Sequence, residues 1–300
     1  MKIFSLDQIQ ESINITHDLE ELINSQKAAF MDCSSGLYDI PFPMQFVFFE
    51  QGSDCHIKGG YRRGSKNFLI KIAGSSKFGN NGTILVFDVA SCELKAILKD
   101  EGFLTTLRTG VAGMICLTLM PWTPQNIGII GNGSLAKQLY KLTRIKYQQA
   151  NIMLYARNKI KAGAIGDLVC DSVEEIVTKC DVVFTTTSST EPIIHVIPQD
   201  RNIFIIALGS DDEYKSEVSP QLFKTADMVI VDSKLQAAKF GDVSRTLKAG
   251  IIAQDKLTEL GAVLKSGIAE NIKTIIADFS GIGAQDVAMA EFVLNKISAN

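Results

Sequence analysis

Residues 126–138 have the sequence NIGIIGNGSLAKQ, and this stretch indicates the fold of the chain. It begins with an apolar run typical of a buried strand and continues into residues that favour a helix. The pattern G-x-G-x-x-A joins the two parts through Gly131, Gly133 and Ala136. Gly131 permits a tight turn, Gly133 allows the backbone to approach a pyrophosphate, and Ala136 allows the helix to pack closely on the strand. The succession predicts a dinucleotide site, with a simple glycine-rich turn as the alternative.

The chain after this turn alternates between apolar runs and helical segments. Ser134 and Leu135 open the first predicted helix, where backbone N–H groups would face an anion. Further strands are expected at 151–156, 181–187, 202–209 and 227–233, with helices through about residue 147 and at 172–180. Continuous apolar strands separated by helices indicate a parallel sheet covered on both faces. The predicted fold class is therefore α/β, with a doubly wound Rossmann sheet.

The prolines at 121 and 124 predict a domain boundary just before this sheet, because proline disfavours helix in the residue before it. The preceding part is rich in predicted strands. We expect helices at 5–31 and 105–119, strands at 46–49, 56–61, 68–73 and 83–88, and a turn at 80–82. The sequence thus predicts a β-rich α+β domain over 1–119 and a Rossmann domain over 120–271.

Composition excludes several classes of partner. The 300 residues include 30 basic and 33 acidic side chains without a basic block, which disfavours nucleic acid and anionic membrane surfaces. No apolar stretch approaches the ~18 residues of a membrane span. The cysteines form no C-x-x-C pair and the histidines are scattered, so no metal site is expected. Asp7 interrupts the N-terminus early, and reduced thiols without an export signal predict a cytoplasmic protein.

The end of the second Rossmann strand normally holds the residue that contacts the adenosine ribose. NAD-selective sites place Asp or Glu there, whereas arginine accommodates a 2′-phosphate. Arg157 follows this strand without an acid, so we predict an NAD(P)(H) cofactor with a preference for NADP(H). The alternative is that Arg157 only solvates the strand end. Thr187 and Ser188, after a later strand, are expected to line the same nucleotide cleft.

Five segments in order resemble the ornithine cyclodeaminase/μ-crystallin family. They are AILKDEGFLTTLRTGVAG (96–113), IGIIGNGSLAKQ (127–138), DVVFTTTSSTEPII (181–194), ALGSDDEYKSEVSP (207–220) and FSGIGAQDVAMA (279–290). The resemblance implies a homodimer that transfers hydride between NAD(P) and the α-carbon of a small imino or amino acid. Such members include ketimine reductases, Δ1-pyrroline-2-carboxylate reductases and amino-acid dehydrogenases. It also implies that the β-rich domain binds substrate and dimerises, with residues 272–300 returning to it.

Two cationic residues are candidates for binding the substrate. An α-amino or α-imino acid presents a carboxylate, which arginine binds with two directional hydrogen bonds. Arg108 matches the family arginine with this role, and its apolar neighbours argue against a solvated surface arginine. Lys71 matches a family lysine that contacts the same carboxylate, and it is also a candidate for catalysis. Alternation along its strand leaves open that Lys71 points to solvent.

Asp211 is the principal candidate for proton transfer. It follows Gly209 beyond a predicted strand, at the edge where open α/β sheets bind ligands. A carboxylate there can exchange a proton with the reacting amine, and the catalytic aspartate of the family aligns with Asp211. Asp212 competes for this register, and a structural turn aspartate is the alternative. Lys215 and Glu217 match the same motif and are expected to fix the loop.

Two departures from the family pattern affect the predicted substrate pocket. Gln45 replaces an arginine that many members carry in a Pro-x-Arg motif, and the segment 74–82 is short. These changes put ornithine in doubt as the substrate. Two alternatives stay open: an ornithine cyclodeaminase that converts ornithine to proline and ammonia, and a weakly catalytic nucleotide-binding protein like the crystallin members.

Overall fold

A computed structural model describes residues 1–166 and 168–299, which divide into two compact units. Unit 1 consists of Met1–Arg108 with Ile282–Asn300, and unit 2 of Thr109–Gly281. These bounds differ from the predicted ones at 119/120 and 271/272. The reason is that helix α3 (Phe103–Leu119) continues from one unit into the other, and strand β15 (Thr274–Asp278) belongs to the sheet of unit 2. The assignment of substrate and cofactor to different domains stays a prediction.

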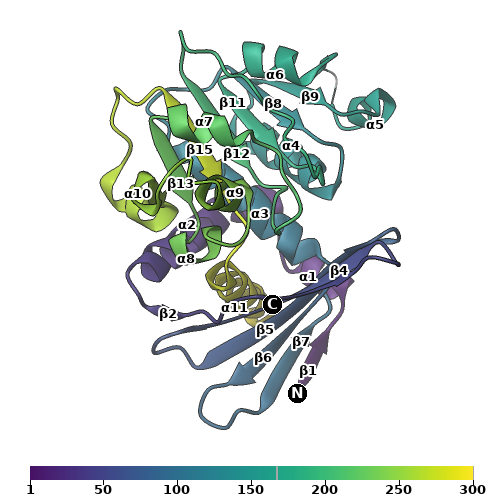
Figure 1. Cartoon of the computed structure of the whole chain (residues 1–300). Coiled ribbons are helices and arrows are strands. Elements are labelled where there is room, and N and C mark those ends of the chain that lie inside the picture. Colours follow the sequence, from purple (N-terminus) through teal and green to yellow (C-terminus); the bar gives the residue numbers. More distant parts are fainter. Residues whose placement is uncertain (167, 300) are drawn as a thin grey trace. The chain divides into compact units, whose positions relative to one another are not determined.

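Unit 1 is built on a mostly antiparallel sheet (Figure 1). Its strands are β1 (Lys2–Phe4), β2 (Tyr38–Asp39), β3 (Met44–Phe48), β4 (Ser53–Arg62), β5 (Asn67–Ser76), β6 (Gly79–Asp88) and β7 (Leu94–Leu98). They lie in the order β1-β7-β6-β5-β4-β2, with β3 also paired to β4 and with β1 parallel to β7. Helix α11 (Gly283–Ala299) packs on β4 and on helix α2 (Ile15–Ser34). One face of the sheet is thereby buried.

Two local predictions for unit 1 are wrong. The helix expected at 5–31 is in fact two helices, α1 (Leu6–Glu11) and α2, because the side chain of Asn14 caps α2 and starts it anew. The turn expected at 80–82 lies at residues 77–78, and 80–82 instead extend β6. Gly79 provides the left-handed backbone at this turn, with a φ of +116°.

Unit 2 contains a parallel sheet in the order β10-β9-β8-β11-β12-β15-β13-β14 (Figure 1). Besides β15, its strands are β8 (Asn126–Ile130), β9 (Asn151–Tyr155), β10 (Leu168–Val169), β11 (Val182–Thr185), β12 (Ile203–Ala207), β13 (Met228–Val231) and β14 (Leu257–Glu259). The helices are α4 (Ser134–Lys146), α5 (Lys159–Gly163), α6 (Val173–Lys179), α7 (Pro220–Thr225), α8 (Lys234–Ala237), α9 (Asp242–Lys248) and α10 (Leu260–Ser266). The predicted α/β class with a doubly wound Rossmann sheet is confirmed.

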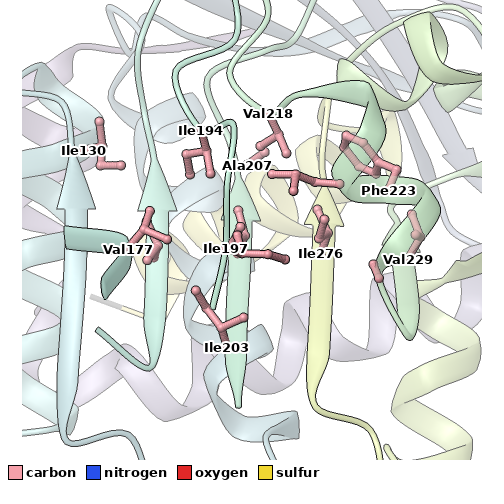
Figure 2. Close-up of a cluster of buried hydrophobic side chains, with 14 of the residues drawn as sticks. Ile130, Val177, Ile194, Ile197, Ile203, Ala207, Val218, Phe223, Val229 and Ile276 are labelled. Atoms are coloured by element: carbon pink, nitrogen blue, oxygen red, sulfur yellow. The ribbon is translucent and has the colours of Figure 1, made fainter. Parts of the chain in front are cut away.

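Aliphatic side chains form the core on one face of this sheet (Figure 2). Ile203, Ala207 and Ile276 come from the central strands β12 and β15, and Val218 and Phe223 cover them. Every residue of β12 and β15 is buried, which explains their continuous apolar sequence. Burial of each large aliphatic side chain contributes roughly 1.5–3 kcal/mol. Among the described residues, no helix is both long and apolar enough to cross a membrane.

The order of the strands in unit 2 reverses direction at β8. From β8 the chain proceeds outward to β9 and β10, and it then returns to the other side of β8 to form β11 and β12. Ligands of open α/β sheets bind beyond the carboxyl ends of the strands at such a reversal. The segments that follow β8, β11 and β12 are therefore the candidate nucleotide site.

Candidate active site

The glycine-rich turn connects β8 to helix α4. Gly131 has a φ of +132°, and a Cβ atom at this position would lie 2.2 Å from the hydroxyl oxygen of Thr186. Only glycine is therefore compatible with the turn. Gly133 is the N-cap of α4 and lacks a side-chain cap, and nothing lies within 4 Å of where its Cβ would stand. The turn thus leaves room for a ligand beside backbone N–H groups.

The first turn of α4 completes this arrangement. Ser134 is exposed and Leu135 half-buried, so their N–H groups lie near the surface at the end of the helix. Such N–H groups lack partners within the helix and favour an anion. Ala136 is fully buried, which permits close contact of α4 with β8. The residues present fit the pyrophosphate of a dinucleotide.

Three further predicted cofactor residues follow the ends of neighbouring strands. Arg157 is exposed directly beyond β9, and Asn158 caps helix α5 behind it. Ser188 is exposed beyond β11. The hydroxyl of Thr187 points elsewhere, because it donates to Glu217 Oε1 at 2.8 Å. The amide of Thr187 donates to the same oxygen, so both donors of this residue are directed at Glu217.

Glu217 is a buried carboxylate that joins two of these strand ends. Its Oε2 atom accepts hydrogen bonds from the Thr185 hydroxyl at 2.7 Å and from Gly209 N at 2.8 Å. Its Oε1 atom accepts from the amide and the hydroxyl of Thr187. Burial raises the pKa of Glu217 to about 7, and the hydrogen bonds oppose this shift. Glu217 therefore fixes the segments after β11 and β12 together, a larger role than the loop contact expected from the sequence.

Asp211 and Asp212 follow β12 and differ clearly in their surroundings. Asp212 is buried, and its Oδ1 atom accepts hydrogen bonds from Tyr214 N and Lys215 N, both at 2.7 Å. The side chain of Asp211 is 41% exposed, and its Oδ1 atom lies 2.6 Å from Lys215 Nζ. Asp212 thus holds the loop, whereas the Asp211 carboxylate is accessible. This geometry favours Asp211 over its register competitor.

Unit 1 brings Lys71, Arg108 and Asp286 together into a buried cluster. Lys71 Nζ donates to Asp286 Oδ1 at 2.7 Å, and Arg108 Nε lies 3.3 Å from the same oxygen. Arg108 Nη1 donates to Gln285 Oε1 at 3.2 Å, and Gln285 Nε2 donates back to the Arg108 carbonyl. Lys71 is 1% exposed, so the alternative that it points to solvent is wrong. The two predicted carboxylate-binding residues therefore lie side by side.

The charges of this cluster act strongly on one another. Burial lowers the pKa of Lys71 to about 7, although Asp286 opposes the shift. Burial would raise the pKa of Asp286, but the charges of Lys71, Arg108 and Lys58 outweigh it and hold that pKa below its usual value. Lys71 is thus mainly protonated below about pH 7.

Sequence reasoning missed Asp286 and Gln285 as members of this cluster. The one available signal was an acid and an amide within the apolar helical run GAQDVAMA (283–290). The histidines give no sign of a catalytic role. His56 is buried beside the Gln45 amide at 3.4 Å, and His195 is exposed.

Comparison with protein families explains the combination of sheet, turn and buried cations. The family model for the ornithine cyclodeaminase/mu-crystallin family matches residues 8–300 of this sequence. This chain belongs to that family. The membership confirms the resemblance drawn from the five sequence segments.

Proteins named for several different activities are similar to this chain. A cyclodeaminase of Sinorhizobium fredii, described as uncharacterized, is 30% identical over 80% of this chain and 79% of its own length. The structure of Δ1-pyrroline-2-carboxylate reductase of Thermococcus litoralis with NADH and L-proline has a TM-score of 0.87 at 20% identity, covering 100% of this chain and 98% of the reductase. The structure of an archaeal alanine dehydrogenase dimer with bound NAD has a TM-score of 0.86 at 21% identity, and the match covers 99% of this chain and 96% of the dehydrogenase chain.

Proposed function

We propose that this protein is an NAD(P)-dependent oxidoreductase that transfers hydride at the α-carbon of a small imino or amino acid. The observation that carries the proposal is the buried pairing of Lys71 and Arg108 around Asp286. Charged side chains are costly to bury, so a cationic pair in a protein interior points to an anionic ligand such as a carboxylate. The similar proteins are named as a Δ1-pyrroline-2-carboxylate reductase, an alanine dehydrogenase and a cyclodeaminase. These names support an imino or amino acid as the substrate of this chain.

The cofactor proposed for unit 2 is NAD(P)(H), which supplies or accepts the hydride when bound. Gly131, Gly133 and the start of α4 would hold its pyrophosphate. Asp211 would hold or donate the proton that accompanies reaction at the substrate nitrogen. In unit 1, Arg108 and Lys71 would orient the substrate carboxylate. A location in the cytoplasm stays a prediction.

We expect tighter binding of NADPH than of NADH because of Arg157. The exposed guanidinium beyond β9 can donate charge-assisted hydrogen bonds to a 2′-phosphate. Arg157→Ala should weaken NADPH binding by about 10- to 150-fold and leave NADH binding nearly unchanged, as titration of intrinsic fluorescence would measure. Lys161→Ala, an exposed cation in α5, is the matched control. An unaltered ratio of the two affinities in Arg157→Ala would remove this assignment.

Because of Lys71, we expect kcat/KM to fall on the alkaline side of its pH profile. A protonated lysine binds a carboxylate, and its protonated fraction falls as pH rises through the pKa of about 7. The ratio kcat/KM should therefore fall by roughly tenfold for each pH unit above this value. Lys71→Arg keeps a permanent positive charge, so its profile should lose this limb. If the limb persists in Lys71→Arg, it belongs to another group.

A substrate panel tests the proposed function directly. Purified protein is supplied with NADH or NADPH and with imino acids, or with 2-oxo acids plus ammonia, and the absorbance of the reduced nicotinamide is followed. Net consumption of reduced cofactor supports the proposal. The absence of both turnover and cofactor binding would overturn it and would leave a binding protein without this chemistry.

A cyclodeaminase is the second candidate function. It is favoured by the Sinorhizobium relative, which carries that name at 30% identity. In this case the chain would release ammonia from a diamino acid such as ornithine without net change in the cofactor. Ammonia release and proline formation at constant nicotinamide absorbance would distinguish it from a reductase. Nucleotide binding without either reaction would favour the crystallin-like alternative.

We also propose a homodimer formed through unit 1. The face of the sheet that points away from Lys71 carries a groove of about 760 Å³. Its lining includes Gly59, Tyr61, Phe68 and Ile70, and the neighbouring strand β3 exposes Phe46. Sedimentation should therefore show a dimer at micromolar concentration. Phe46→Asp should shift it toward monomer, whereas Phe78→Asp at the 90% exposed tip of the β5–β6 hairpin should not. A monomeric wild-type protein would contradict the proposal.

A further inference from the structure

Arg108 is held by a buried glutamine, Gln285 of helix α11. The Nη1 atom of Arg108 donates to Gln285 Oε1 at 3.2 Å, and Gln285 Nε2 donates to the Arg108 carbonyl at 3.4 Å. Gln285 thus contacts both the guanidinium and the backbone of the same residue. Both residues are buried, with 5% of Arg108 and 1% of Gln285 exposed. A long side chain held in this way has lost much of its rotamer freedom before any ligand binds.

A second contact fixes the plane of the same guanidinium. Asp286, the next residue of α11, places its Oδ1 atom 3.3 Å from Arg108 Nε. The guanidinium is planar and rigid, so contacts at Nη1 and at Nε together set its tilt as well as its position. Both partners come from the first turn of one helix. The start of α11 therefore determines how the head of Arg108 is oriented.

Helix capping is the simpler explanation for a glutamine at this position. The Oε1 atom of Gln285 also accepts a hydrogen bond from Ile282 N at 3.1 Å, directly before α11 begins. Glutamine or glutamate at the third position of a helix commonly accepts such a bond. A glutamate would serve at least as well, because negative charge is favourable at a helix N-terminus. Capping alone therefore does not account for the amide group.

The amide differs from a carboxylate in two ways that concern Arg108. It has a donor, Nε2, which bonds to the Arg108 carbonyl, whereas an ionised carboxylate only accepts. It is also uncharged, so it orients the guanidinium without neutralising it. A carboxylate at position 285 would pair with Arg108 and compete with an anionic ligand. Asp286 already contacts Lys71 and Arg108, so a second acid would balance both cations.

We propose that Gln285 is a positioning residue, which orients Arg108 for the substrate carboxylate without neutralising it. The inference rests on the proposed function, in which Arg108 binds that carboxylate. Gln285 acts through Arg108 and has no part in hydride or proton transfer. Gln26 of α2 belongs to the framework, since its Nε2 atom donates to the Gln285 carbonyl at 3.1 Å. It supports the backbone of Gln285 rather than its amide group.

Three variants separate positioning from capping. Gln285→Glu keeps the acceptor for the cap and adds a charge, and Gln285→Met keeps the length of the side chain but removes both polar atoms. Gln26→Met is the matched control, because Gln26 is a fully buried glutamine of the same unit. Calorimetry measures binding of the unreactive monocarboxylate propionate to the protein saturated with oxidised cofactor. KM and kcat are measured with a verified substrate, and urea unfolding checks that each variant is folded.

Gln285→Glu should weaken propionate binding by at least about tenfold although it keeps the helix cap, because the new carboxylate occupies Arg108 and repels the ligand. Gln285→Met should weaken it by about 5- to 30-fold, as expected for loss of hydrogen bonds to a charged group. KM should rise by a similar factor in each variant and should change more than kcat. Gln26→Met should stay within about threefold of the wild type.

A double-mutant cycle shows whether Gln285 acts through Arg108. In the Arg108→Ala background the group that Gln285 positions is absent. Gln285→Met should then change propionate binding by less than about threefold. A general structural role would instead add its full loss in both backgrounds, because effects of independent sites are additive.

Two results overturn this inference. One is wild-type affinity for propionate in Gln285→Glu, which would leave capping as the role of Gln285. The other is an equal loss from Gln285→Met with and without Arg108. Propionate binding that depends on Gln285 only when Arg108 is present, without turnover of any substrate, supports the inference and removes the proposed function. Turnover with an unchanged KM in both Gln285 variants removes the inference and supports the proposed function.

Discussion

Replacement of Asp211 by asparagine is expected to lower kcat by roughly 10²- to 10⁴-fold, the usual contribution of general acid–base catalysis. The asparagine keeps the size of the side chain but cannot exchange a proton at neutral pH. Asp211 is the accessible carboxylate after β12, whereas the Asp212 carboxylate accepts hydrogen bonds from backbone amides of its own loop. Single-turnover kinetics on a verified substrate would measure the effect on chemistry separately from product release.

Dinucleotide binding should survive in Asp211→Asn, because the groups that would hold the pyrophosphate lie at Gly131 and Gly133. Asp255→Asn, an exposed acid of unit 2, should leave kcat within about twofold and serves as the matched control. Arg108→Ala should instead raise KM as well as slow turnover, since it removes a substrate contact. Near-normal turnover by Asp211→Asn would contradict the assignment and make Asp212 or Lys71 the next candidate.

Asp286→Asn is expected to reduce the free energy of unfolding of unit 1 by about 3–5 kcal/mol. The reason is that Lys71 and Arg108 would stay buried without the carboxylate that lies 2.7 Å from Lys71 Nζ and 3.3 Å from Arg108 Nε. Urea unfolding would measure the loss. Hydrogen exchange in β5 and α11 would locate it, because the destabilisation should be greatest in the elements that carry the cluster.

The control for this prediction is an exposed ion pair. Asp171→Asn breaks the contact of Asp171 with Lys159, whose side chains are 86% and 57% exposed, and should have little effect on stability. Replacement of Lys71, Arg108 and Asp286 together by apolar residues of similar size should recover most of the lost stability while abolishing turnover. If Asp286→Asn is no less stable than Asp171→Asn, the cluster does not depend on its carboxylate.

Local sequence was most informative where structure depends on near neighbours. The Rossmann strands that the sequence predicted, β8, β9, β11, β12 and β13, lie within a few residues of their expected bounds, because a parallel strand buried on both faces requires a continuous apolar run. Strands β10, β14 and β15 were not predicted. The predicted turn between β5 and β6 in unit 1 was misplaced, because pairing between the strands outweighed the local turn signal. Asn-Gly at 81–82 favours a turn locally, but Gly79 allows the chain to turn earlier, and pairing along β5 and β6 then keeps residues 80–82 in the strand.

In the candidate site, too, the sequence identified residues whose role depends on near neighbours and missed a residue whose partners are distant in the chain. Gly131, Gly133 and Ala136 serve a turn whose geometry depends on consecutive residues, so sequence alone identified them. Arg108 and Lys71 were identified through family motifs. Asp286 was given no role, because its significance comes from a partner far away in the chain: Lys71 lies 215 positions before it.

The sequence by itself determined the fold class, the family and the position of the nucleotide turn, since hydrophobic periodicity and glycine chemistry act over short distances along the chain. Only the tertiary structure decided which charged side chains share one buried environment. It placed Asp286 against Lys71 and Arg108, Lys58 opposite Lys71, and Glu217 across the ends of β11 and β12. The physical reason is that burial and charge coupling depend on separation in space, and the return of α11 onto β4 brings distant parts of the sequence within a few ångströms.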